Sequence, residues 1–173
     1  MKRVAKFEKV SFEQFKKDIL NTLDFILEEE VQGLYDTIIL PVRATKHSAG
    51  YDFVSPISFV LSPNKSINIP TGIRCKMEEG WVLKIYPRSG LGFKYRLQLN
   101  NTVGIIDGDY YYSDNEGHIF IKVTNCSNEN KVVSIDKGNG FAQGIFIEYG
   151  ITEDDEVNGI RNGGFGSTNK VKE

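Results

Sequence analysis

A succession of short strand-like segments, from Thr37 to Tyr149, most constrains what this chain can fold into. Glycine, proline, asparagine and serine separate the segments at short intervals, which is typical of antiparallel sandwiches and barrels. No helical pattern alternates with them, so a parallel nucleotide-binding sheet is disfavoured. The sequence therefore predicts a mainly β domain. We expect strands over residues 38–40, 51–61, 66–69, 72–77, 81–86, 95–99, 119–124, 131–135 and 143–149.

The N-terminal region has a different pattern. Residues 3–10 alternate as a first short strand, and Ser11 follows as the type of residue that caps a helix. Apolar residues then recur at three- and four-residue steps, which indicates an amphipathic helix over residues 11–32. Such a helix usually covers its own domain, so we assign it a packing role. Its apolar positions are Phe12, Phe15, Ile19, Leu23, Ile26 and Leu27.

Length and composition narrow the class of protein. A chain of 173 residues suits a single domain over residues 1–173, and a net charge of −2 with a pI near 5.8 disfavours nucleic-acid binding. Cys75 and Cys126 lie far apart, without the spacing of a metal site or a disulfide framework. No membrane-spanning segment or signal peptide is visible, so we expect a cytoplasmic protein. Residues 151–173 turn acidic, then glycine-rich and then basic, which predicts a flexible C-terminal segment.

The stretch over residues 99–110 carries the first sign of chemistry. Its first half has strand-forming residues interrupted by Gly104, which suggests a bulge or a ligand close to the backbone. Asp107 follows two isoleucines, where a carboxylate needs a partner or a function. Taken alone, Asp107-Gly108 is more typical of a hairpin turn. Other parts of the chain favour the functional interpretation.

Two segments earlier in the chain are unusual for plain structure. Asp52 stands in a strand entered through small residues, where it could also cap a turn. Arg88 and Ser89 offer donors beside Gly90 and Gly92, whose backbone a ligand could approach closely. Such a loop suits phosphate oxygens, although a surface turn with an ordinary arginine has the same composition.

Two later segments complete the set. Gln143 enters a strand after a turn over residues 138–142, where it could pair with backbone groups or a base edge. Phe165 stands between glycines near the C-terminus, with Arg161 before it and Ser167 after it. An aromatic residue without a core to enter is suited to stack on a flat ligand. A disordered tail would explain the glycines but not the aromatic residue and the arginine.

These five segments, in this order, resemble the five motifs of the trimeric dUTPase family. The resemblance implies a jelly-roll-like β fold, a homotrimer and three active sites at subunit interfaces, each closed by the C-terminal motif. It implies hydrolysis of dUTP to dUMP and pyrophosphate with Mg²⁺ on the triphosphate, which limits uracil incorporation into DNA and supplies dUMP for dTMP synthesis. Five ordered motifs make a specific signal, whereas any one alone does not. The matching segments are residues 49–52, 87–91, 101–110, 138–143 and 161–168, within a resemblance over residues 38–169.

The third motif carries the implied chemistry and base recognition. By this resemblance Asp107 is the general base that deprotonates the water attacking the α-phosphorus. Tyr110 lies against the deoxyribose and rejects a 2′-hydroxyl. Asn101, with the backbone near Gly104 and Ile106, reads the uracil edge, and a tight hairpin there excludes the methyl group of thymine.

The other motifs bind the phosphates and the metal. The resemblance implies that Arg88, Ser89 and Gly90 hold the phosphates and that Gln143 lies near the α-phosphate. Asp52 orients a water molecule on Mg²⁺, since that cation keeps several waters when it binds.

The fifth motif is expected to close the site over the bound nucleotide. The resemblance places Arg161 at the γ-phosphate and Phe165 on the uracil ring. Gly166 and Ser167 are expected to contribute further donors to the phosphates.

The chain also departs from the family pattern. Residues 111–116 make a longer connection after Tyr110, which we expect to extend a hairpin. Gly140 stands where most members have a basic residue, and the N-terminal helix is not a family-wide feature.

Two alternative functions remain at this point. A dCTP deaminase of the same fold needs an added glutamate base and a second arginine, which residues 90–93 do not supply. A non-enzymatic regulatory protein on the same scaffold would not need chemically intact motifs. An Asp107→Asn variant that lost hydrolysis yet kept an effect on a partner would separate enzyme from regulator.

Overall fold

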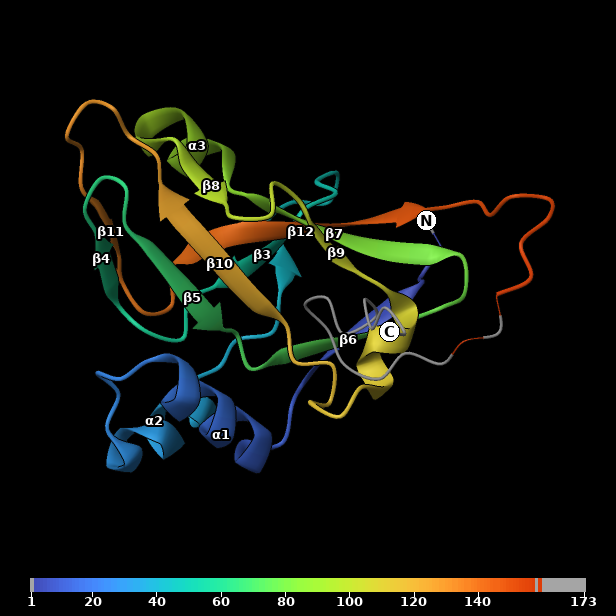
Figure 1. Ribbon diagram of the computed structural model, residues 1–173, viewed down its shortest axis with the longest axis horizontal. Coiled ribbons are helices and arrows are strands. Elements are labelled where there is room, and N and C mark those ends of the chain that lie inside the picture. Colours follow the sequence, from blue (N-terminus) through green and yellow to red (C-terminus); the bar gives the residue numbers. More distant parts are fainter. Residues whose placement is uncertain (1, 158, 160–173) are drawn as a thin grey trace, which may run out of the picture.

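The computed structural model describes residues 2–157 and 159, and its framework is a set of antiparallel sheets (Figure 1). The largest sheet has five strands in the order β2-β3-β12-β7-β9. β12 is the longest strand and lies between β3 and β7, which makes it the centre of this sheet. The strands are β2 (Val42–Arg43), β3 (Tyr51–Val54), β7 (Trp81–Pro87), β9 (Gly104–Ile106) and β12 (Gly140–Glu148).

Smaller sheets complete the framework. One has the order β5-β10-β8, and two further pairs are β11-β4 and β1-β6. Side chains from the large sheet, among them Phe53, Leu83 and Phe141, are fully buried together with Ile69 and Ile121 of the three-stranded sheet. The chain therefore has the predicted mainly β, jelly-roll architecture. The strands are β1 (Ala5–Lys9), β4 (Phe59–Leu61), β5 (Ser66–Pro70), β6 (Ile73–Met77), β8 (Leu97–Leu99), β10 (Phe120–Asn125) and β11 (Val133–Ile135).

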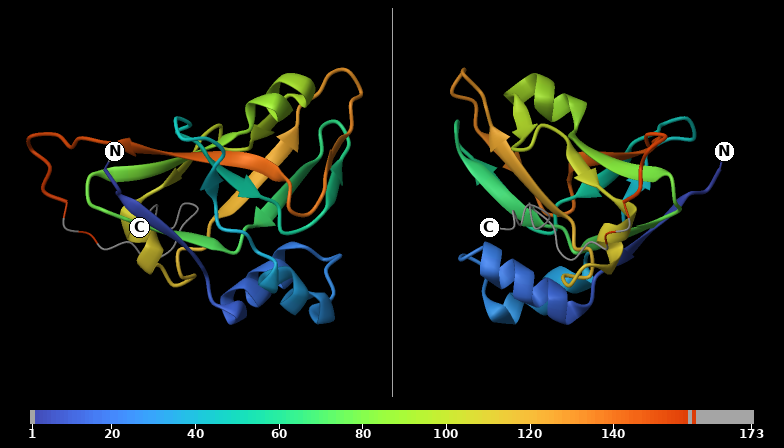
Figure 2. Two further views of the ribbon diagram at one scale, coloured as in Figure 1. Left: turned by 180° about the vertical axis from the view of Figure 1, so that it is seen from behind. Right: turned by 45° about the vertical axis from the view of Figure 1, so that its right-hand side comes forward.

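Helices lie at two ends of this framework. Figures 1 and 2 show α1 and α2 together on one side of the sheets, with α3 at the opposite end. None of the helices in the described part of the chain is long and apolar enough to cross a membrane. The helices are α1 (Phe12–Thr22), α2 (Val31–Asp36) and α3 (Ser89–Tyr95), with 3-10 turns η1 (Glu28–Glu30) and η2 (Gly108–Tyr112).

The N-terminal helix begins as predicted but ends early. The Ser11 side chain accepts a hydrogen bond from the Gln14 backbone N–H at 3.1 Å, which confirms the N-cap. The prediction of one helix over residues 11–32 is wrong, because α1 ends at Thr22 and a turn leads to η1 and α2. The Thr22 hydroxyl donates to the Asp18 carbonyl, a contact that competes with helix propagation. After the turn, Val31 at the start of α2 is fully buried.

Three strand predictions were wrong in position. Residues 38–40 are not a strand, and the first strand after the helices is β2. The segment over residues 51–61 divides into β3 and β4. Pro56 stands between them, and the Ser55 hydroxyl donates a hydrogen bond to the Ile57 carbonyl at 2.6 Å. Residues 100–103 form a turn, so Gly104 begins a strand instead of interrupting one. The proline and the short side-chain contact to the backbone explain the division of residues 51–61.

The carboxylate of Glu8, on β1, joins this strand to η2. It accepts hydrogen bonds from Lys6 at 2.7 Å and from the Tyr111 hydroxyl at 2.6 Å, and lies 3.4 Å from Arg74. These contacts, with the Lys6 hydrogen bond largest, lower the pKa of Glu8 from 4.5 to about 2. Because the pKa is lower in the folded chain, ionised Glu8 stabilises the fold above pH 4.5. That stabilisation disappears as the pH falls toward 2.

A Glu8→Gln variant should therefore lose less stability on acidification than the wild type. The free energy of unfolding, measured by urea denaturation between pH 4.5 and the lowest pH at which the protein folds, should fall less steeply. Glu13→Gln, an exposed substitution on α1, is the matched control and should keep the wild-type slope. Equal slopes for Glu8→Gln and wild type would contradict the prediction.

Candidate active site

A cavity of about 480 Å³ lies where the turn between β8 and β9 meets β10 and η2. It is lined by four residues of the third sequence motif, namely Asn101, Gly104, Ile106 and Tyr110. The structure therefore brings together the four residues that the sequence assigns to base and sugar recognition. Most of its lining surface is apolar, with polar groups at Asn101 and nearby positions, which suits a flat, partly polar ring.

The turn over residues 100–103 forms one wall of this cavity. The Thr102 N–H donates to the Leu99 carbonyl at 3.0 Å, and the Val103 N–H donates to the Asn101 carbonyl at 2.6 Å. Thr102 has φ +66°, a left-handed conformation that keeps the turn tight. Gly104 then enters β9 opposite Ile85, and a Cβ added at Gly104 would lie 3.0 Å from the Ile85 Cβ. The close approach predicted at Gly104 is thus to a neighbouring strand as well as to the cavity.

Tyr110 closes the cavity from η2 and is only 5% exposed. Its hydroxyl donates to the His118 carbonyl at 2.7 Å and accepts from the Asn115 side-chain amide at 2.8 Å. The expectation that residues 111–116 extend a hairpin is wrong. They form the end of η2 and a compact turn that ends at Gly117, whose φ of +69° favours glycine.

A second group of predicted residues gathers where β3, β12 and β7 run side by side. Asp52 and Tyr86 flank Gln143 in the sheet register. The Asp52 carboxylate lies 3.3 Å from Nε of Arg88, and the Gln143 side-chain amide donates to the Pro87 carbonyl at 3.1 Å. The structure thus assembles one residue each from the first, second and fourth motifs.

The segment expected to be a phosphate-binding loop is instead the start of α3. Arg88 precedes the helix, and the first N–H to donate back to Arg88 is that of Leu91, at 3.1 Å. The N–H groups of Ser89 and Gly90 therefore come before the first hydrogen bond of the helix, where backbone donors are open to a ligand. Nη1 of Arg88 also lies 3.5 Å from the carbonyl of Gly140, which stands in place of the family's basic residue.

The two groups lie at different places on the large sheet. The cavity meets the sheet at β9, its edge strand, and at Ile85 of β7, whereas Asp52 and Gln143 lie on β3 and β12. Within the described residues, neither Asp52 nor Arg88 nor Gln143 lines the cavity. One copy of the chain therefore does not bring its phosphate-binding candidates to its own base and sugar cavity.

Asp107 lies beside the cavity of Tyr110, in a neighbouring one of about 710 Å³. Trp81, Lys84 and Tyr112 also line this second cavity, and Ile105 lines both. Asp107 is half-buried and immediately precedes η2. Asp107 thus lines the second cavity and directly follows Ile106, which lines the first.

The described residues fit an Mg²⁺ ion that arrives on a substrate better than one held by a protein cage. Within residues 2–157 and 159, no group of three or more His, Cys, Asp or Glu side chains is placed to hold a metal. Asp52 supplies a single carboxylate, already paired with Arg88. Mg²⁺ in phosphate-transfer sites takes one or two carboxylates, often through water, and substrate oxygens for the remainder. This donor set is compatible with that arrangement.

Four predicted site residues of the fifth motif lie outside the described residues, namely Arg161, Phe165, Gly166 and Ser167. Lys122 and its partner Asn68 across β10 and β5 also line the cavity and were not predicted. Polar residues that alternate along a strand do not distinguish a cavity wall from a solvent-facing surface.

The chain is similar to known proteins of one family. The dUTPase family model matches residues 36–170. Deoxyuridine 5′-triphosphate nucleotidohydrolase of Lactococcus lactis is 42% identical over 134 residues, which cover 76% of this chain and 88% of the relative.

The chain is also similar to solved structures of dUTPases. The crystal structure of dUTPase from Streptococcus mutans has a TM-score of 0.61 and 32% identity, covering 85% of this chain and 98% of that one. The dUTPase of Staphylococcus bacteriophage 80alpha, solved with dUPNHPP, has a TM-score of 0.62 and 21% identity, covering 96% and 98%, and shares the fold. By its family match and its identity to these relatives, the chain belongs to the dUTPase family.

Proposed function

We propose that this chain hydrolyses dUTP to dUMP and pyrophosphate. The observation that carries the proposal is the cavity in which Asn101, Gly104, Ile106 and Tyr110 meet, with Asp107 in the neighbouring cavity. A relative of this chain is named for the same hydrolysis. The activity would remove dUTP from the nucleotides available for DNA synthesis and produce dUMP, a precursor of dTMP.

Recognition of the nucleoside takes place in the cavity. Asn101 and the backbone from Gly104 to Ile106 offer donors and acceptors to the edge of uracil, and the tight turn leaves little room for a methyl group. The Tyr110 ring lies against the deoxyribose, where a 2′-hydroxyl would clash with it or lose its water. Such a site discriminates against other nucleotides by its shape and by the polar groups of the site that they would leave unpaired.

Recognition of the triphosphate uses the second group. The Arg88 guanidinium and the N–H groups of Ser89 and Gly90 are donors suited to phosphate oxygens, and Gln143 reaches the α-phosphate. Asp52 orients a water molecule on the Mg²⁺ ion, which neutralises charge on the triphosphate when bound.

The fifth motif belongs to the same proposal. Arg161 contacts the γ-phosphate, and Phe165 stacks on uracil. Gly166 and Ser167 donate to phosphate oxygens. These roles rest on the sequence motif, which the family model includes within residues 36–170.

The chemical step is a displacement at the α-phosphorus. Asp107 accepts a proton from a water molecule as the water oxygen bonds to the α-phosphorus. The bond to the bridging oxygen between the α- and β-phosphorus breaks, and pyrophosphate leaves with the electron pair. General-base assistance of this type contributes about 10²- to 10⁴-fold to a rate.

A complete site requires more than one copy of the chain. Within the described residues, none of Asp52, Arg88 and Gln143 lines the cavity of its own chain, so a nucleotide in the cavity is served by Arg88 and Gln143 of another copy. We therefore propose a homotrimer with three shared sites, in which copies related by rotation exchange these groups.

Pyrophosphate release from dUTP, dCTP, dTTP and UTP tests the proposal. With Mg²⁺ present, release should be fast from dUTP and slow from the other three, and a chelator should abolish it. Ammonia release from dCTP would instead indicate a deaminase. A folded protein that releases pyrophosphate from no nucleotide would favour a regulatory protein on the same scaffold.

A further inference from the structure

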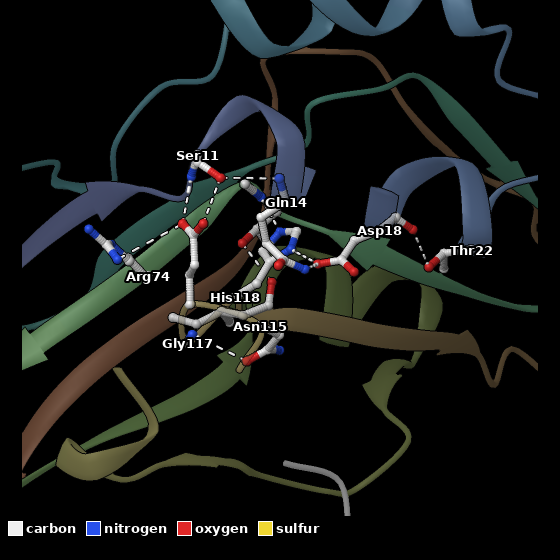
Figure 3. A network of polar contacts seen from close by, with 12 residues as sticks. Ser11, Gln14, Asp18, Thr22, Arg74, Asn115, Gly117 and His118 are labelled. Atoms are coloured by element: carbon white, nitrogen blue, oxygen red, sulfur yellow. Dashed lines mark hydrogen bonds and ion pairs between the residues drawn. The ribbon is translucent and has the colours of Figure 1, made fainter. Parts of the chain in front are cut away.

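The two parts of this chain that depart from the family pattern, the N-terminal helix and the loop after Tyr110, are bonded to each other (Figure 3). Glu116 of the loop accepts hydrogen bonds from the backbone N–H of Ser11 at 2.7 Å and from its hydroxyl at 2.6 Å. Ser11 is the N-cap of α1. The start of the added helix and the end of the added loop are thus fixed by the same carboxylate.

A buried histidine makes the second connection. His118 has no exposed surface, and its Nε2 accepts a hydrogen bond from the Gly72 N–H at 2.7 Å. Its ring proton therefore lies on Nδ1, which donates to the Asp18 carboxylate of α1 at 2.6 Å. Figure 3 shows Asp18 and His118 facing one another between the helix and the loop. These two hydrogen bonds, one at each ring nitrogen, fix the orientation of the His118 ring.

The loop that Glu116 and His118 connect to α1 also contacts the Tyr110 hydroxyl. The acceptor for the Tyr110 hydroxyl is the backbone carbonyl of His118, and the donor to that hydroxyl is the side chain of Asn115. Asn115 is fixed in turn, because its side-chain oxygen accepts from the Gly117 N–H at 3.2 Å. The hydroxyl end of Tyr110 is thus held by the loop, and the loop is held by α1.

We propose that Asn115 and Asp18 are positioning residues that fix the ring of Tyr110 and thereby set the preference for a deoxyribose over a ribose. The inference rests on the proposed function, which places this ring against the sugar. A ring free to tilt would leave room for a 2′-hydroxyl, whereas a ring bonded at its far end would not. The N-terminal helix then supports substrate selection at a site that it does not itself line.

Asn115→Ser is the informative variant. A serine hydroxyl can still accept from the Gly117 N–H, as in a Ser/Thr turn, but is too short to reach the Tyr110 hydroxyl. The ratio of kcat/KM for dUTP to that for UTP should fall about fivefold, with kcat for dUTP changed less than about twofold. Asn128→Ser, in an exposed loop position, is the matched control and should keep the wild-type ratio.

A double-mutant cycle separates positioning from a general loss of stability. Tyr110→Phe removes the hydroxyl that Asn115 contacts, so adding Asn115→Ser to it should change the ratio by less than about twofold. Asp18→Ala should lower the ratio in the wild type but not in the Tyr110→Phe background, and Asp24→Ala, exposed after α1, should do neither. Equal changes in both backgrounds, or none in either, would overturn the proposal.

Equilibrium binding of dUMP and UMP to the same variants gives a readout independent of hydrolysis. The preference for dUMP should follow the same cycle. A wild type that hydrolyses no dUTP would refute the proposed function, whereas active variants with an unchanged preference would refute only the positioning role.

Discussion

Asp107→Asn should lower kcat for dUTP hydrolysis by about 10²- to 10⁴-fold, the contribution of a general base. The substitution keeps the shape of the side chain, so the half-buried position at the start of η2 is preserved. An amide cannot take the proton from the attacking water, and KM should change little because Asp107 does not line the nucleoside cavity. Initial rates of pyrophosphate release, with dUMP binding measured alongside, check both expectations.

The matched control is Asp114→Asn, an exposed residue of the loop after Tyr110. It makes the same chemical change and should retain wild-type kcat. Wild-type kcat in Asp107→Asn would show that the base lies elsewhere, and loss of dUMP binding would point to damage of the site. If a variant without hydrolysis still affects a partner protein, the regulatory role exists beside catalysis.

Mixing this variant with Arg88→Ala tests whether the site is shared. Neither variant should be active alone. Unfolding and refolding the two chains together should recover about a quarter of the wild-type activity, the share of interfaces at which random mixing brings intact Asp107 to intact Arg88. The prediction follows from the proposed sharing of sites, since Arg88 does not line the cavity of its own chain. No recovery would indicate that each site is built within one chain.

Local physics explains what the sequence predicted well. The cap at Ser11 depends on residues within one helical turn, and most strands depend on alternation over a few residues. The four cavity residues of the third motif are close in sequence, so a single turn and the short helix after it bring them together.

Long-range contacts account for what the sequence did not predict. The register that aligns Asp52 with Gln143 joins strands far apart in the chain, and the motifs alone do not show that neither residue lines the cavity. His118 has no local signal at all, since its partners Asp18 and Gly72 are distant in sequence. The burial of Val31 after the early end of α1 is also a tertiary feature that the helical pattern did not predict.

Phe15→Ala should lower the free energy of unfolding by about 3–5 kcal/mol, the usual loss for a large aromatic side chain removed from a core. Phe15 is fully buried, and its ring centroid lies 5.8 Å from that of Tyr35 and 6.2 Å from that of His118. It therefore joins the N-terminal helix to the β framework as well as to α2. Urea denaturation at a fixed protein concentration measures the loss.

Phe25→Ala is the matched control for this prediction. It makes the same substitution in the same N-terminal region, but Phe25 is 55% exposed, so the loss should stay below about 1 kcal/mol. If the helix were a separate appendage, Phe15→Ala would melt it first and leave the unfolding of the β framework unchanged. A single transition shifted to lower urea, with helix and strand signals coincident, would show that α1 and the sheets form one cooperative core.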